Sequence, residues 1–184
     1  MNSTVITYQG LIGAPAQFNQ VLFGGLLGSW FSFLQFISSP LIGGFSDIYG
    51  RRLILLLCLS VTLISHLLWL YSSSSFLLFI LSRTIGGLSK GNISLSTAIV
   101  TDVSNQAERG KGMAMIGISF SVAFIVGPLL GASFSYYSKS IGLLPNEFFI
   151  PPAFFACVLT FINIAFIFFT FSESLKPSQR VCLR

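Results

Sequence analysis

Long apolar runs, each ended by charged or turn-forming residues, alternate with short polar segments along the 184-residue sequence. A helix needs roughly 20 consecutive, mostly apolar residues to cross the hydrocarbon core of a bilayer. Runs of this length predict membrane-spanning helices. The predicted helices are at residues 21–42, 53–71, 76–100, 112–136 and 148–171. Residues 1–20 precede this bundle, and residues 172–184 follow it as a tail.

The overall composition supports a membrane protein. Only 8% of the residues are charged and 53% are hydrophobic, and the mean hydropathy is +0.84. Because an ordinary soluble domain carries about 25% charged residues, a soluble globular fold is excluded. The sequence predicts an all-α, multi-pass integral membrane protein whose main partner is the lipid bilayer. It does not distinguish the plasma membrane from an internal membrane.

The basic residues of the predicted loops are concentrated on one side of the bundle. Lys and Arg collect on the cytoplasmic side of membranes. If every predicted helix crosses, one side contains Arg51, Arg52, Arg109, Lys111, Lys176, Arg180 and Arg184, and the opposite loops contain Lys139. We therefore expect the tail in the cytoplasm and residues 1–20 on the extracellular or lumenal side. Glu173 would then lie within reach of Arg109 or Lys111.

Several function classes are not expected from this sequence. The net charge is +5, but the basic residues are dispersed among apolar runs and form no stripe that would bind nucleic acid. The sequence contains no Ser-His-Asp set, metal-ligand cluster or phosphate-binding loop, so we expect no enzyme, metal site or cofactor. Cys58, Cys157 and Cys182 are far apart and are predicted to be small apolar fillers. Lipid attachment is the alternative for Cys182.

The predicted loop after the first helix combines glycines with charged residues, namely Gly43, Asp47, Gly50, Arg51 and Arg52. Gly43 allows close helix approach, and Gly50 permits a tight turn. Asp47 can accept charge-assisted hydrogen bonds from Arg51, from Arg52 or from the N-terminus of a neighbouring helix. We predict that this cluster latches the cytoplasmic side in one conformation. The alternative is that the two arginines only fix the orientation in the membrane.

The third predicted helix carries two cations, Arg83 and Lys90, inside a span. At 100° per residue they share one face with small or polar residues that include Gly87 and Ser94. Each cation costs about 2.5–3.5 kcal/mol on insertion scales, so each needs a partner or a water-filled cavity. We predict that these four residues bind an anionic substrate group. The alternative is that each cation pairs with a carboxylate on another helix.

Two other features of the predicted spans suggest a function. Gly127, Pro128 and Gly131 form a predicted helix-kink motif, because proline removes one helical hydrogen bond and glycine lets a partner backbone approach. Generic helix packing is the alternative for this motif. His66 is the single histidine of the chain and lies inside a span. It is interpreted either as a proton relay or as a hydrogen-bond donor between helices.

Three of these segments resemble motifs of the major facilitator superfamily. Residues 43–52 resemble its motif A, with Phe45 in the place of the usual Leu. Residues 83–87 resemble motif B, with Gly86 where Gln is usual, and residues 127–131 resemble part of the antiporter-associated motif C. Longer strings, of which residues 86–100 are the most specific, resemble a tetracycline-transporter-like branch of the family.

The resemblance implies a secondary transporter of which this chain contains roughly the second to the sixth helices. In that family substrates cross by alternating access, and organic anions are the proposed substrates of the branch. We therefore expect transport of small amphipathic organic anions, with the presence of a coupling proton or ion left open. The alternative is a truncated fragment or isoform that transports nothing and acts only as an interaction partner in the membrane.

Overall fold

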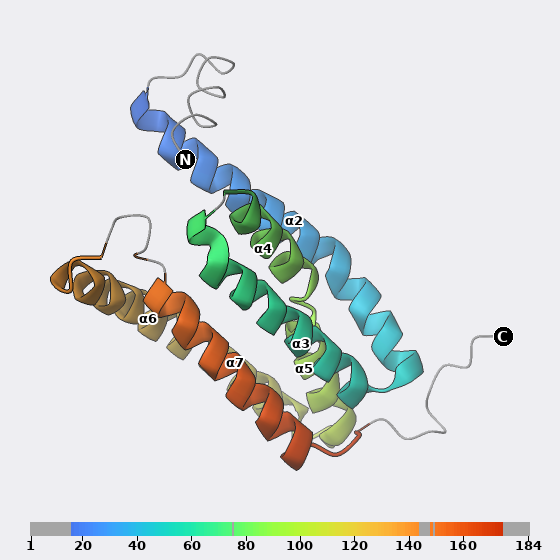
Figure 1. The fold of residues 1–184 in the computed structure, drawn as a ribbon. Coiled ribbons are helices and arrows are strands. Elements are labelled where there is room, and N and C mark those ends of the chain that lie inside the picture. Colours follow the sequence, from blue (N-terminus) through green and yellow to red (C-terminus); the bar gives the residue numbers. More distant parts are fainter. Residues whose placement is uncertain (1–15, 75, 144–147, 149, 175–184) are drawn as a thin grey trace.

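The computed structural model describes residues 16–74, 76–143, 148 and 150–174, and within these every regular element is a helix (Figure 1). The predicted all-α class is confirmed. The elements are α2 (Ala16–Tyr49), α3 (Arg51–Leu70), the short 3-10 helix η1 (Tyr71–Ser74), α4 (Phe76–Leu88), α5 (Asn92–Val103), α6 (Arg109–Ser140) and α7 (Ile150–Thr170). Most of the predicted N-terminal segment lies outside the described residues, as do Lys176, Arg180, Cys182 and Arg184.

Helix α2 is longer at both ends than the span predicted at residues 21–42. It continues through residues 43–49, which the sequence analysis assigned to a loop. The chain reverses at Gly50, whose φ of +104° is readily accessible to glycine and strained for other residues. Because one glycine makes the whole turn, α3 begins directly at Arg51. The polar residues of the predicted loop therefore project from the ends of two rigid helices.

The span predicted at residues 76–100 is divided into α4 and α5 by residues 89–91. Within this break the Lys90 N–H donates to the Gly87 carbonyl at 3.4 Å, a tighter spacing than an α-helix uses. A Cβ atom added at Gly91 would lie 2.7 Å from Cβ of Ile42 on α2. The absence of a side chain at Gly91 thus lets α2 pack directly against the break.

Four continuous segments of the described chain are long and apolar enough to cross a membrane: Gly24–Tyr49, Arg51–Leu70, Arg109–Ser140 and Ile150–Thr170. They correspond to the first, second, fourth and fifth predicted spans, with boundaries shifted by a few residues. Helices α4 and α5 together occupy the remaining one. The chain is a multi-pass membrane protein.

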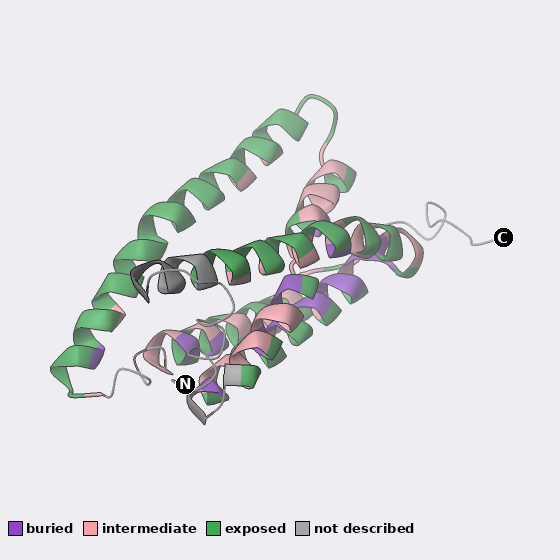
Figure 2. Cartoon of the chain, turned by 90° about the horizontal axis from the view of Figure 1, so that it is seen from above, coloured by how far each residue is buried: buried purple, intermediate pink, exposed green. Residues whose placement is uncertain are grey.

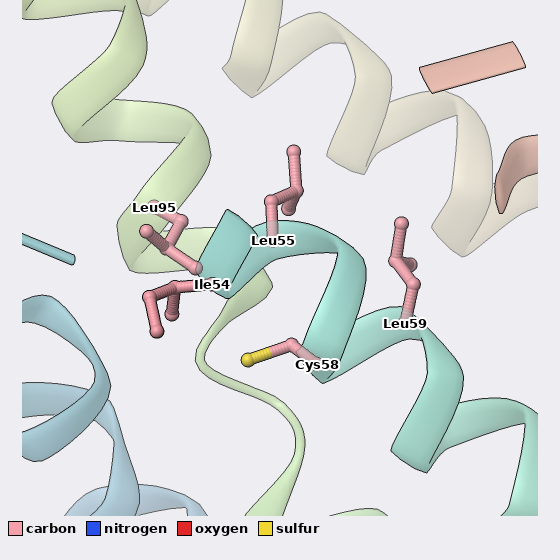
Figure 3. Close-up of a cluster of buried hydrophobic side chains, with 5 residues drawn as sticks. All are labelled: Ile54, Leu55, Cys58, Leu59 and Leu95. Atoms are coloured by element: carbon pink, nitrogen blue, oxygen red, sulfur yellow. The ribbon is translucent and has the colours of Figure 1, made fainter. Parts of the chain in front are cut away.

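Helix α3 lies at the centre of the packing and contacts α2, α4, α5 and α7. Its buried core residues are Ile54, Leu55, Cys58 and Leu59, which join Leu95 of α5 (Figure 3). Partly buried isoleucines from α2, α5 and α7 pack against this cluster, namely Ile42, Ile99, Ile164 and Ile167. Cys58 and Cys157 are both buried and not in a disulfide, as expected for apolar fillers.

Helix α6 is almost wholly exposed along its length and packs mainly against α5 and α7 (Figure 2). Pro128 lies within this helix, which continues on both sides of it. A Cβ atom added at Gly127 or Gly131 would meet no described atom within 4 Å. The close approach predicted for these glycines is therefore not made within the described part of the chain, and their role in a kink motif stays a prediction.

Candidate functional site

Polar side chains of α3 hold α4 in place at the middle of the bundle. Thr62 Oγ1 lies 2.9 Å from Ser89 Oγ, and the Ser65 hydroxyl donates to the Ser82 carbonyl at 2.7 Å. All four of these residues are buried. Since Thr62 and Ser65 are three residues apart, they share one face of α3. This face fixes the position of the helix that carries Arg83.

Arg83 contacts two aromatic rings. Its guanidinium carbon is 4.8 Å from the Trp69 ring centroid and 5.1 Å from that of Phe79. Trp69 belongs to α3 and Phe79 to the preceding turn of α4. Cation–π contacts of this kind contribute about 0.5–2 kcal/mol each, so they offset part of the cost of keeping a charge in the membrane. The rings hold the guanidinium without neutralising it.

Lys90 lies in the break between α4 and α5 and is half-buried. The ion pairs found among the described residues all involve Arg51, so neither Lys90 nor Arg83 has a carboxylate partner there. Both charged residues of the predicted substrate site are thus without a counter-ion in the described chain.

The two small residues of the predicted substrate site have structural contacts. A Cβ atom added at Gly87 would lie 3.0 Å from the Phe31 carbonyl oxygen, and the Ser38 hydroxyl donates to the Gly87 carbonyl at 3.4 Å. Gly87 therefore lies at the contact between α4 and α2. The Ser94 hydroxyl donates to the Gly91 carbonyl at 2.8 Å. Direct contact of Gly87 or Ser94 with a substrate stays a prediction.

Arg51 is the centre of the predicted latch and is 8% exposed. Its guanidinium contacts Asp47 at 2.7 Å and Asp102 at 3.0 Å, and it also donates to the Ser46 hydroxyl. The Asp47 contact is one of those that the sequence predicted for this cluster. Ser46 and Asp102 were missed. Asp102 lies 51 positions from Arg51, and no local pattern indicates the pairing.

Glu173 joins the same cluster from the end of α7, which differs from the contact with Arg109 or Lys111 expected from the sequence. Its carboxylate accepts hydrogen bonds from the backbone N–H groups of Arg51 at 2.9 Å and Arg52 at 3.4 Å. These N–H groups are at the N-terminus of α3, where the helix dipole favours negative charge. The dipole and free donors therefore determine where Glu173 binds.

The other predicted latch residues have separate contacts. The Arg52 guanidinium donates to the Phe168 carbonyl at 2.6 Å and lies 5.8 Å from the Phe168 ring centroid. It is thus anchored to α7, whereas the sequence suggested Asp47 as its partner. The Gly43 carbonyl accepts the Ser46 hydroxyl at 2.6 Å, and a Cβ atom at Gly43 would meet nothing described within 4 Å. The close helix approach expected at Gly43 is not made within the described residues.

Comparisons with known proteins point to one family. The family model described as Major Facilitator Superfamily matches residues 4–181. The chain is similar to human major facilitator superfamily domain-containing protein 10, with 46% identity over 92% of this chain and 34% of that protein. It is also similar to the class B tetracycline resistance protein of Escherichia coli, with 28% identity over 82% of this chain and 35% of that protein.

A solved structure gives the same result for the fold. The crystal structure of the human organic anion transporter MFSD10 (TETRAN) matches with a TM-score of 0.76 and 44% identity, over 96% of this chain and 39% of that one. This chain thus spans between about a third and two fifths of the length of these relatives. The motifs, the helical fold and the family match agree, and the chain belongs to the major facilitator superfamily of membrane transporters.

Proposed function

We propose that this chain forms part of a secondary transporter that moves small amphipathic organic anions by alternating access. The observation that supports the proposal is that Arg83 and Lys90, which lie in a predicted span, have no carboxylate partner in the described chain. Two uncompensated cations in a low-dielectric environment favour an anionic ligand. The aromatic rings of Trp69 and Phe79 beside Arg83 suit the apolar part of an amphipathic molecule.

The Arg51 cluster supplies a means of holding one side closed. It connects the turn between α2 and α3 to Asp102 near the end of α5 and to Glu173 just after α7. Such a cluster stabilises the arrangement in which these helix ends are together. In alternating access, a conformation closed on this side interconverts with one that is open there. The strength of the cluster would therefore influence the rate of interconversion between the two conformations.

Transport is proposed for the full-length protein that contains this segment, since alternating access moves one helical bundle against another. A chain that acts only as an interaction partner in the membrane is the alternative. The exposed surface of α6 favours this alternative, because the most apolar stretch of the helix contains no buried residue. Saturable uptake by vesicles containing only the 184-residue chain would contradict both, because it would show that this chain transports by itself.

The test of the proposed site is uptake of a radiolabelled naphthalenesulfonate into vesicles that contain the full-length protein. Lys90→Ala should reduce the uptake rate by about tenfold or more, and Lys90→Arg should retain part of it because the charge persists. Arg83→Ala should have a smaller effect, since Trp69 and Phe79 already contact its guanidinium. Lys139→Ala is the control, because Lys139 is an exposed cation in the last turn of α6. Wild-type kinetics for Lys90→Ala would refute the anion site.

A further inference from the structure

Trp69 of α3 has a buried hydrogen-bond donor without an acceptor. Its indole nitrogen, Nε1, is almost inaccessible to solvent and makes no hydrogen bond within the part of the chain that the structure describes. The other tryptophan of the sequence, Trp30 of α2, donates from its indole nitrogen to Thr84 Oγ1 at 3.2 Å. Most buried polar groups in proteins have a partner, because leaving one unpaired is unfavourable. The unpaired N–H group of Trp69 therefore requires an explanation.

The Arg83 guanidinium lies against the same indole. Its central carbon is 4.8 Å from the Trp69 ring centroid. Among the described residues Arg83 donates no hydrogen bond and takes part in no ion pair. A guanidinium has five N–H donors and no acceptor, and an indole N–H is a donor only. These two neighbouring side chains thus present donors alone, and none of the donors has an acceptor in the described chain.

The contact between α3 and α4 fixes the positions of both side chains. Ser65, one helical turn before Trp69, donates its hydroxyl to the carbonyl of Ser82, the residue before Arg83, at 2.7 Å. Both serines are buried. The backbones that carry the two unpaired donor groups are therefore held together by a buried hydrogen bond. Donors that are fixed in this way are preorganised for a common ligand, because little freedom is lost when the ligand binds.

We propose that Trp69 is a specificity-determining residue of the anion site, whose indole N–H donates to one oxygen of a bound carboxylate or sulfonate while Arg83 pairs with another. This inference rests on the proposed transport of organic anions. An oxyanion has several acceptor atoms and a negative charge, so it satisfies the unpaired donors and compensates the guanidinium charge. Because Nε1 is buried and Arg83 lies over the same ring, the anion reaches Nε1 by drawing the guanidinium away from the ring.

The test measures equilibrium binding of a radiolabelled naphthalenesulfonate to the purified full-length protein, together with its thermal unfolding in detergent. Trp69→Phe keeps an aromatic ring beside Arg83 but has no N–H group. A second variant replaces the Trp69 indole with benzothiophene, which has the same fused-ring shape and a sulfur atom in place of the N–H group. Trp30→Phe is the matched control, because it removes an indole N–H that already has an acceptor in Thr84.

We expect both Trp69 variants to weaken binding of the sulfonate by about tenfold. The benzothiophene variant should unfold at the same temperature as the wild type or at a higher one, because the donor it lacks has no partner in the described chain. Trp30→Phe should keep its affinity within about twofold of wild type. In an Arg83→Gln background Trp69→Phe should weaken binding by a smaller factor, since the two side chains bind one anionic group.

The remaining outcomes contradict the proposal in different ways. Wild-type affinity in the benzothiophene variant would overturn the role of the indole N–H and leave the proposed function intact. Weakening by Trp69→Phe alone would show that the bulk of the ring matters and the donor does not. A lower unfolding temperature of the benzothiophene variant, with wild-type affinity, would show that the N–H group has an acceptor elsewhere in the full-length protein. Absence of sulfonate binding and uptake by the wild type would overturn the proposed function, and this inference with it.

Discussion

Arg51 Nε lies 3.0 Å from a carboxylate oxygen of Asp102, although 51 positions separate the two residues. The contact joins the first turn of α3 to the last turn of α5. Glu173 extends it to the chain after α7 by accepting the Arg51 backbone N–H at 2.9 Å. Three helix ends that are distant in sequence are thus held by one buried arginine, on the side that the loop cations predict to be cytoplasmic.

The Arg51 cluster predicts unequal effects for its two aspartates. The Asp102 side chain is 24% exposed and that of Asp47 is 42% exposed. Asp102→Asn should lower the free energy of unfolding by about 1–3 kcal/mol, because it removes charge from a hydrogen bond to a buried guanidinium. Asp47→Asn should cost about 1 kcal/mol or less, since a solvent-exposed ion pair is weak. Denaturant unfolding of both variants in detergent micelles, followed by circular dichroism, measures the difference.

A further measurement tests this assignment. The rate of anion exchange by the full-length protein in vesicles should change more for Asp102→Asn than for Asp47→Asn, at matched amounts of protein. Equal destabilisation by the two substitutions would show that Asp102 is not the stronger partner of Arg51.

Close packing at the α4–α5 break predicts that Gly91→Ala is destabilising. The added methyl group would approach Cβ and Cγ2 of Ile42 to 2.7 Å, so α2 and α5 would have to separate. Overpacking of this kind costs about 1–3 kcal/mol. Thermal unfolding in detergent should therefore occur at a lower temperature than in the wild type.

Gly28→Ala is the matched control for this substitution. A Cβ atom at Gly28 would meet nothing described within 4 Å, and alanine is favoured over glycine inside a helix by up to about 1 kcal/mol. It should leave stability unchanged or raise it. A Gly91→Ala variant as stable as Gly28→Ala would mean that α2 does not pack closely against the break.

Orientation in the membrane can be tested at the two ends of α6. The distribution of loop cations predicts Arg109 in the cytoplasm and Lys139 on the opposite side. Single-cysteine variants at these positions are made in a background that lacks Cys58, Cys157 and Cys182. An impermeant maleimide added to intact cells that display the protein at their surface should label Lys139→Cys, and should label Arg109→Cys only after permeabilisation. The reverse pattern would invert the topology.

The sequence by itself determined the membrane class, the family and the approximate helix positions. Bilayer thickness sets the length of an apolar run, and this requirement acts on consecutive residues, so it can be read along the chain. Contacts between residues close in sequence were equally accessible, and Asp47 with Arg51 is the example. The presence of Arg83 and Lys90 within a predicted span could also be read from the sequence, because the residues around them are mostly apolar.

Only the tertiary structure decided which distant groups meet. It paired Arg51 with Asp102, directed Glu173 to the N-terminus of α3, placed Arg83 against Trp69 and broke a predicted helix beside Ile42. Each of these contacts depends on how one helix is rotated and shifted along another. That arrangement results from the packing of many side chains at once, and a few residues of local pattern do not encode it.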